Sequence, residues 1–244
     1  MTVLITGAGK GLGRALAVEF SKKGHDLVLV SRNKRDLEET RSLCSTKTEI
    51  FNYDISKPEN ASRLFKSLQK KDIKIDILVN NAGIGYVGLI TETSIIQIKE
   101  LIDTNYMGSV YTTKAFLDEI KSRSGSIIFI NSIAGRILIP NFGAYCASKF
   151  ALDAFAKSLS KEENINIVNV YPGPMNTNFY DNESFKILKK RYFFIDPEIA
   201  ANKIITKVLK KKKNIVIPSY LRLLILANRI MPGFVRFLFN RFYE

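Results

Sequence analysis

Tyr145 and Lys149 lie four residues apart in a segment, 143–162, whose pattern predicts a helix, so their side chains share one face. A free tyrosine has a pKa of about 10, and a neighbouring lysine cation favours the phenolate and lowers that pKa. Such a pair can exchange a proton with an alcohol oxygen near neutral pH. Ser132 ends a predicted strand thirteen residues before Tyr145 and can polarise a carbonyl oxygen. These groups fit the reduction of a carbonyl, or its reverse.

Asn105 is a fourth candidate. It lies within the predicted helix 94–122 and can hold a water that links Lys149 to bulk solvent. Lys149 can also bind the ribose of a nicotinamide cofactor. A tyrosine and a lysine at this spacing also occur as ordinary surface pairs. Here, however, all four residues occur together, in order along the chain and on the predicted strands and helices that such a site requires. The sequence therefore predicts Asn105, Ser132, Tyr145 and Lys149 as catalytic residues.

A glycine-rich turn joins the first predicted strand to the first predicted helix. It reads T-G-A-G-K-G-L-G, with Gly7, Gly11 and Gly13 in the spacing G-x3-G-x-G. Glycines allow a tight turn and bring backbone N–H groups close to a pyrophosphate at a helix N-terminus. A turn without a ligand is the alternative interpretation. The predicted nucleotide contacts in this turn are Gly7, Lys10, Gly11, Leu12 and Gly13.

The second predicted strand ends at Ser31 and Arg32, where an NAD site usually has an acid for the ribose 2′-hydroxyl. A guanidinium suits a 2′-phosphate, and Lys10 can reach the same group. This pattern favours NADP(H) as the cofactor, although both cations could simply be solvated. After the next strands, Asp54 and its neighbour Ile55 are expected at the adenine. We expect Asn81, Ala82 and Gly83 against the sugar.

Strand-like and helix-like segments alternate along the chain. The strands occupy 3–6, 26–31, 48–52, 76–80, 126–131, 166–171 and 214–218, and the helices occupy 12–23, 33–44, 58–70, 94–122, 143–162 and 197–211. This alternation predicts βαβ units and a parallel sheet with helices on both faces. We expect one α/β domain over 1–244, with 218–244 as a helical extension. The irregular connection 176–196 is typical of a functional loop, often a lid.

With these motifs, the chain resembles a short-chain dehydrogenase/reductase of about 250 residues. The resemblance rests on Thr6–Gly13, Asp54, Asn80–Gly83, Asn105, Ser132, Tyr145, Lys149, Pro172, Gly173 and Thr177. It implies a Rossmann-type doubly wound sheet of seven strands in the order 3-2-1-4-5-6-7. It also implies catalysis by the four residues named above and cofactor contacts from Pro172, Gly173 and Thr177, the last at the nicotinamide carboxamide. A homodimer through 94–122 and 143–162 is the family expectation.

The expected activity is NADP(H)-dependent hydride transfer between a nicotinamide and a carbonyl or secondary alcohol. Apolar residues after the strand ends suggest an apolar or lipid-like substrate and a pocket. They are Val87, Leu89, Ile133, Leu138, Ile139, Phe142, Met175, Phe179 and Tyr180. Two alternatives stay open: an NADP-binding module without catalysis, and a membrane-surface protein that acts through its tail.

The positive charge is concentrated near the end of the chain. Residues 186–244 hold 14 basic and three acidic residues, or +11 of the net +14. The tail combines Arg222, Arg229 and Arg236 with many apolar residues, and Pro232-Gly233 should divide it into two short helices. It can pack on its own domain or across a dimer, lie in a membrane interface, or bind an acidic protein. The tail also departs from the glycine-rich ending of many family members, which argues against the usual tetramer and against a ketoacyl-carrier-protein reductase.

Several classes are disfavoured by composition. The chain is 46% hydrophobic and 25% charged, as is usual for globular domains. No nucleic-acid motif, metal-ligand spacing, signal peptide or spanning segment is found, so we expect a cytoplasmic protein without a metal, in contact with a membrane at most peripherally. The cysteines, Cys44 and Cys146, are expected to be free thiols, and His25 is expected at the surface.

Overall fold

The computed structural model describes residues 1–177, 179, 184, 185, 194–235 and 237. The strands are β1 (Thr2–Thr6), β2 (Asp26–Ser31), β3 (Thr48–Asn52), β4 (Ile77–Asn80), β5 (Ser126–Ile130), β6 (Asn166–Pro172) and β7 (Asn214–Ile217). The α-helices are α1 (Gly11–Lys22), α2 (Lys34–Ser42), α3 (Pro58–Lys70), α4 (Ile95–Ile102), α5 (Gly108–Ser122), α6 (Gly143–Glu162), α7 (Pro197–Leu209) and α8 (Leu221–Ile230).

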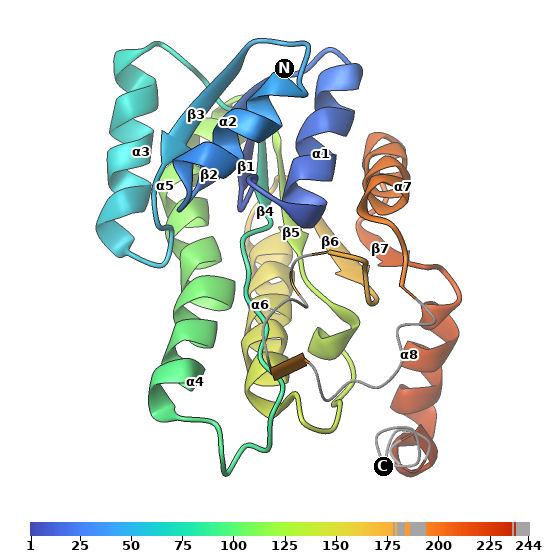
Figure 1. Cartoon of the computed structure of the whole chain (residues 1–244). Helices are drawn as coiled ribbons and strands as arrows, with labels where there is room; N and C mark the ends of the chain where they lie inside the picture. The colour runs from blue at the N-terminus through green and yellow to red at the C-terminus, as the bar shows by residue number, and fades with distance from the viewer. Residues whose placement is uncertain (178, 180–183, 186–193, 236, 238–244) are drawn as a thin grey trace.

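The strands form one parallel sheet in the order β3-β2-β1-β4-β5-β6-β7. This confirms the expected Rossmann-type topology, and every predicted strand agrees with the structure to within one residue. Because the strands run the same way, their carboxyl ends meet at one edge. That edge lies at the lower side of the molecule in Figure 1, toward α8.

Helices cover both faces of the sheet (Figure 1). Alternate residues of a strand point to opposite faces, so Val3 and Ile5 join a core with α1, α2 and α7. Leu4, between them, joins a second core with α3, α5 and α6. The strands are rich in Val, Ile and Leu because both of their faces are covered.

Side chains at the helix starts explain several boundaries. Asn33 caps α2 by accepting a hydrogen bond from the N–H of Asp36. Ser94 and Gln97 form a capping box at the start of α4. Proline at the first position begins α3 and α7, where its missing N–H removes no helical bond.

The long helix predicted over 94–122 is interrupted. A π-helical turn, Asp103–Met107, separates α4 from α5. The periodicity continues through this turn, so the sequence pattern did not reveal it. The cause is tertiary: the side chain of Asn105 bonds to the backbone of Ile84 and to Ser148. Single π-turns of this kind often occur at functional sites.

The tail begins as predicted, with α8 ending at Ile230 and helical residues resuming at 232–235. Leu221, Leu224 and Ile225 pack against the body of the protein, beside Tyr171. The tail residues 236 and 238–244 lie outside the described residues. Among the described residues, no helix combines the length and the apolar character that crossing a bilayer requires.

The expectation for His25 was wrong. Its side chain is buried and packs edge-to-face on Phe20, with ring centroids 5.7 Å apart. Burial lowers the pKa of this imidazole. The turn before β2 is therefore covered by α1, a contact that local polarity does not reveal. Cys44 and Cys146 are both free, as expected.

Candidate active site

The glycine turn after β1 is shaped by close backbone approaches. Gly7 and Gly11 have φ values of +66° and +53°, which favour glycine. A Cβ at Gly13 would overlap the carbonyl oxygen of Gly7. A Cβ at Gly11 would lie 3.1 Å from the Cβ of Thr177, so the turn and Thr177 are in contact. Leu12 packs into the core beneath them.

The end of β4 is tied to this turn through Thr6. The N–H groups of Asn81 and Ala82 donate to Thr6 Oγ1 at 3.0 and 3.1 Å. The amide of Asn81 donates to the carbonyls of Thr6 and Gly7. These bonds hold the glycine turn and the 81–83 segment side by side, as two walls of one site.

Gly83, Asn105 and Lys149 meet behind that wall. A Cβ at Gly83 would lie 3.2 Å from Asn105 Oδ1 and 3.6 Å from Lys149 Nζ. Asn105 is fully buried, and Ile84 N–H donates to its Oδ1 at 2.8 Å while its Nδ2 donates to Ile84 O at 3.0 Å. Both polar atoms of its side chain are therefore bonded to the backbone of Ile84. The water predicted between Lys149 and bulk solvent would have to bind another atom of Asn105.

Tyr145 and Lys149 project from one face of α6. Tyr145 and Lys149 are 8% and 4% exposed, and Lys149 Nζ lies 5.9 Å from the centre of the Tyr145 ring. Lys149 donates to the carbonyl of Ile130 at the end of β5. Ser132 follows the same strand, and its Oγ accepts from Ala134 N–H. The predicted serine, tyrosine and lysine are therefore held by β5 and α6 at the carboxyl edge of the sheet.

Burial strongly affects Lys149. Desolvation lowers the pKa of its ammonium from 10.5 to about 8, because a low-dielectric surrounding disfavours the charged form. Below pH 8 the group still carries its charge. A cation beside a tyrosine ring favours loss of the phenolic proton. The arrangement thus concentrates positive charge where a proton is to be exchanged.

Aromatic side chains surround Tyr145. Phe179 packs edge-to-face on it at 5.6 Å and Phe142 at 6.2 Å. Phe185 contacts both Phe179 and Phe142, and Ser184 accepts a hydrogen bond from Val87 N–H. Phe179 of the 176–196 connection therefore contacts the tyrosine directly, and Phe185 contacts it through Phe179 and Phe142.

The apolar pocket prediction was mixed. Val87, Ile139, Phe142 and Phe179 join the cluster around Tyr145. Ile133 and Met175 belong to other clusters, Leu89 and Leu138 are exposed, and Tyr180 lies outside the described residues. The cluster members that the pocket prediction missed include Ile84, Tyr86, Leu101 and Phe185.

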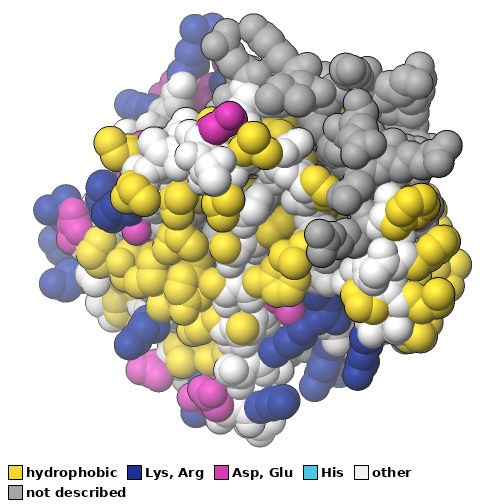
Figure 2. Space-filling model, turned by 90° about the horizontal axis from the view of Figure 1, so that it is seen from below, with side chains coloured by type: hydrophobic (Ala, Val, Ile, Leu, Met, Phe, Trp, Pro, Cys, Tyr) yellow, Lys and Arg dark blue, Asp and Glu magenta, His cyan; other side chains and the backbone are white. Residues whose placement is uncertain are grey.

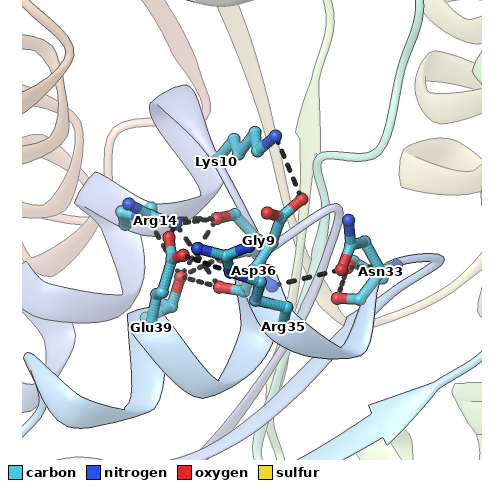
Figure 3. Close-up of polar contacts among 10 residues, drawn as sticks. Gly9, Lys10, Arg14, Asn33, Arg35, Asp36 and Glu39 are labelled. Atoms are coloured by element: carbon cyan, nitrogen blue, oxygen red, sulfur yellow. Dashed lines mark hydrogen bonds and ion pairs between the residues drawn. The ribbon is translucent and has the colours of Figure 1, made fainter.

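Lys10 is paired with an acid that the sequence analysis did not identify. Its Nζ lies 3.3 Å from a carboxylate oxygen of Asp36, in the first turn of α2 (Figure 3). A Cβ at Gly9 would lie 2.9 Å from Asp36 Cβ and 3.0 Å from Ser31 Oγ. Lys10, Ser31 and Asp36 therefore meet at the outer side of the glycine turn.

Arg14 fastens the same turn to α2. Its guanidinium donates to the carbonyl of Gly9 through Nε at 3.0 Å and Nη2 at 2.7 Å. It also bonds to Thr40 and Glu39 of α2, as Figure 3 shows for Gly9 and Glu39. Arg14, which lies just after the glycine-rich segment, thus fixes the turn to α2.

Arg32 and Asp54 line one cavity of about 400 Å³. The opposite wall comes from the 84–86 segment, α4 and the π-turn, including Gln97 and Thr104. Ile55 is buried beneath, where Gly108 leaves room for it. Arg32 and Asp54, both expected at the nucleotide, thus line the same cavity, whereas the sequence pattern did not indicate its helical wall.

A buried ionic cluster supports α6 from behind. Asp153 accepts from Tyr171 Oη at 2.6 Å and pairs with Arg136 at 3.1 Å and Lys157 at 2.5 Å. The Arg136 guanidinium lies over the Tyr171 ring at 4.9 Å. This cluster joins α6 to β6 and to the loop after Ser132. Burial raises the pKa of the Asp153 carboxyl despite its cations.

The end of β6 completes the carboxyl edge. Pro172 is its last residue, and Gly173 N–H donates to Ile217 O at 2.7 Å. Among the described residues, no group of three or more His, Cys, Asp or Glu could hold a metal.

A doubly wound parallel sheet with a glycine turn at its first crossover and polar groups at its carboxyl edge is typical of Rossmann-type dinucleotide-binding proteins. Comparison with known proteins identifies the family. The family model described as short chain dehydrogenase matches residues 1–186. This chain belongs to the short-chain dehydrogenase/reductase family.

Relatives and solved structures agree with this assignment. The chain is 35% identical over 240 residues to estradiol 17-beta-dehydrogenase 11 of Pongo abelii, covering 94% of this chain and 79% of that protein. It is 26% identical to an alcohol dehydrogenase of Thermococcus sibiricus complexed with 5-hydroxy-NADP, with a TM-score of 0.80 over 88% of this chain and 95% of that one.

A short-chain dehydrogenase/reductase of Burkholderia phymatum in complex with NAD shares the fold at 20% identity, with a TM-score of 0.86 over 96% and 94% of the two chains. Structures with this fold thus hold either NAD or NADP forms. The choice between the two cofactors depends on local side chains.

Proposed function

We propose that this protein is an NADP(H)-dependent oxidoreductase that interconverts a carbonyl and a secondary alcohol on an apolar or lipid-like substrate. The observation that carries the proposal is the buried Lys149 ammonium beside the Tyr145 ring, bonded to the end of the strand that Ser132 follows. A surface pair would be solvated and would have no such role.

The residues fit a dinucleotide. The cradle formed by Gly7, Gly11 and Gly13 excludes side chains where a pyrophosphate would approach the backbone, and Lys149 would bind the nicotinamide ribose. The bound cofactor supplies or accepts the hydride at the substrate carbon. In the reductive direction Tyr145 donates its hydroxyl proton to the substrate oxygen, and Ser132 donates a hydrogen bond to that oxygen. The Lys149 cation stabilises the resulting phenolate.

The preference for NADP(H) is supported by Arg32 and Lys10. Arg32 is exposed at the end of β2 and lines the same cavity as Asp54. Lys10 is half-exposed and held by Asp36, so its ammonium is already directed to the outer side of the glycine turn. A 2′-phosphate brings two negative charges to these cations, whereas a 2′-hydroxyl brings none.

Fluorescence titration with NADPH and NADH tests the cofactor proposal. Arg32→Ala should weaken NADPH binding about 10- to 100-fold and leave NADH binding unchanged. Arg35→Ala is the matched control, because Arg35 is a nearby exposed arginine on α2 that pairs with Glu39. Equal affinities of the wild type for both nucleotides would contradict the 2′-phosphate assignment.

The apolar substrate is supported by the aromatic cluster around Tyr145. Apolar walls with few polar groups are typical of sites for hydrophobic ligands. A series of ketones of increasing hydrocarbon length tests this, with kcat/KM expected to rise along the series. The homodimer through 94–122 and 143–162 stays a prediction, and a solution mass measurement will test whether the chain is a dimer.

A further inference from the structure

The outer surface of α8 is apolar. Leu223, Leu226 and Ile230 are 72%, 51% and 69% exposed, and their spacing of three and four residues places them along one side of the helix. We call these three residues the outer stripe. Met231 and Phe234, just beyond it, are also more than half exposed. Side chains of this size normally avoid water unless they have a partner.

The opposite side of α8 is fixed to the body. Leu221, Leu224 and Ile225 pack against Tyr171 and its neighbours. Asn228 donates to the carbonyl of Arg136, in the loop that follows Ser132. The outer stripe is therefore presented by an anchored helix beside the candidate active site.

Positive charge accompanies the stripe. Arg222 and Arg229 are exposed on α8, and their positions on a helix of 3.6 residues per turn place both along one edge of the stripe. Arg222 also donates to the carbonyl of Asn214, at the start of β7. The helix contains no acidic residue. An apolar stripe bordered by arginines matches an interface where hydrocarbon lies below anionic headgroups.

A second apolar group lies on the same face of the molecule. It consists of Leu89, Ile90, Ile95, Ile96 and Leu138, each more than half exposed. In Figure 2, hydrophobic side chains gather both under the start of α4 and over α8 on the face seen from below. Glu92 and Glu100 are exposed near the α4 group, and these acids would not attract an anionic surface. We therefore expect the electrostatic attraction to anions to come from α8.

We propose that this face docks on an anionic lipid surface, with the outer stripe in the interface and Arg229 at the headgroups. The docking does not depend on the redox chemistry. A second copy of the chain fits less well, because a two-fold contact over α8 would bring the arginine edge near its own copy with no acid on the helix to pair with it. A groove-binding peptide would cover one apolar group but not both.

Vesicle co-sedimentation tests the proposal. The full chain should bind phosphatidylcholine vesicles that contain phosphatidylserine more strongly than vesicles of phosphatidylcholine alone, and high salt should weaken this binding. The double variant Leu226→Glu with Ile230→Glu should bind at least about tenfold more weakly. Arg229→Gln should lose about fivefold on the anionic vesicles only.

Leu209→Glu is the matched control. Leu209 is 52% exposed but ends α7, at the amino edge of the sheet, so this variant should bind like the wild type. NADPH titration of each variant separates the two proposals, because the stripe variants should keep their cofactor affinity. Failure of the wild type to bind anionic vesicles while it binds NADPH would overturn the docking. Vesicle binding by the double variant at the wild-type level would also overturn it. So would a double variant that changes from a dimer to a monomer while its vesicle binding stays the same.

Discussion

The helices α6 and α8 invert the usual distribution of side chains in opposite ways. Helix α6 buries charge: Lys149 and Asp153 are 4% and 6% exposed. Helix α8 exposes apolar residues, and Leu221 is its one buried residue. Charged residues are seldom fully buried unless they are paired, and large exposed apolar patches mark contacts with something outside the chain. The proposed proton transfer on α6 and the proposed docking of α8 would each account for one of these two departures.

The largest expected effect is on α6, from Tyr145→Phe. Loss of the hydroxyl removes the proton donor, so kcat should fall about 10²- to 10⁴-fold. Cofactor affinity should change little, because the ring and its aromatic contacts are retained. Stopped-flow or steady-state turnover together with NADPH titration measures both. Wild-type turnover would remove Tyr145 from the mechanism.

Lys149→Met should separate chemistry from stability. Turnover should fall as far as in Tyr145→Phe, but the free energy of unfolding at pH 7 should rise by about 2 kcal/mol. The pKa of Lys149 falls from 10.5 to about 8 on folding, which opposes folding by about 3 kcal/mol while the unfolded lysine is charged. Loss of its bond to Ile130 O offsets about 1 kcal/mol of that gain.

The stability difference between the wild type and Lys149→Met should depend on pH. Between pH 8 and 10.5 the unfolded chain binds the Lys149 proton more tightly than the folded chain, so this group makes wild-type stability rise with pH in that window. The variant lacks that rise. Urea unfolding at pH 7 and pH 10 should therefore show a gap between the two proteins that narrows at high pH, and a less stable variant at pH 7 would contradict the burial argument.

Tyr171→Phe probes the other buried charge of α6. It removes the 2.6 Å hydrogen bond to Asp153 without changing the shape of the ring. Loss of such a donor to a buried carboxylate should lower the free energy of unfolding by about 2 kcal/mol. Urea unfolding should show this as a lower midpoint with an unchanged denaturant slope. Tyr220→Phe is the control, since Tyr220 is 54% exposed, and its stability should stay at the wild-type value.

The smallest expected effect belongs to α8. Leu226→Glu replaces an exposed side chain, so stability and turnover on a water-soluble ketone should stay within about 0.5 kcal/mol and twofold of the wild type. Thermal unfolding and a standard assay measure these quantities. A loss of several kcal/mol would mean that the outer stripe belongs to the core, and the contrast between the two helices would disappear.

Local patterns predicted much of this molecule. The strands follow from runs of Val, Ile and Leu, and the glycine turn follows from spacing that a helix start requires. Tyr145 and Lys149 were identified because helical spacing fixes their common face. In each case the information lies within a few residues of the feature it specifies.

The missed features depend on distant segments. The π-turn exists because Asn105 reaches Ile84, and Lys10 is paired because α2 brings Asp36 across the glycine turn. His25 is buried by Phe20. No periodicity carries such information, because each contact forms only when separate elements pack together.

The bridge between Met175 and Ile195 has a consequence for redesign. Asn176 N–H donates to Ile195 O at 3.0 Å, and Ile195 N–H donates to Pro174 O at 3.1 Å, so the intervening stretch is clamped at both ends. Changing the length of a clamped loop alters its closure entropy only slowly. The connection can therefore change in length at small entropic cost, provided that the contacts of Phe179 with Tyr145 and of Ser184 with Val87 are kept.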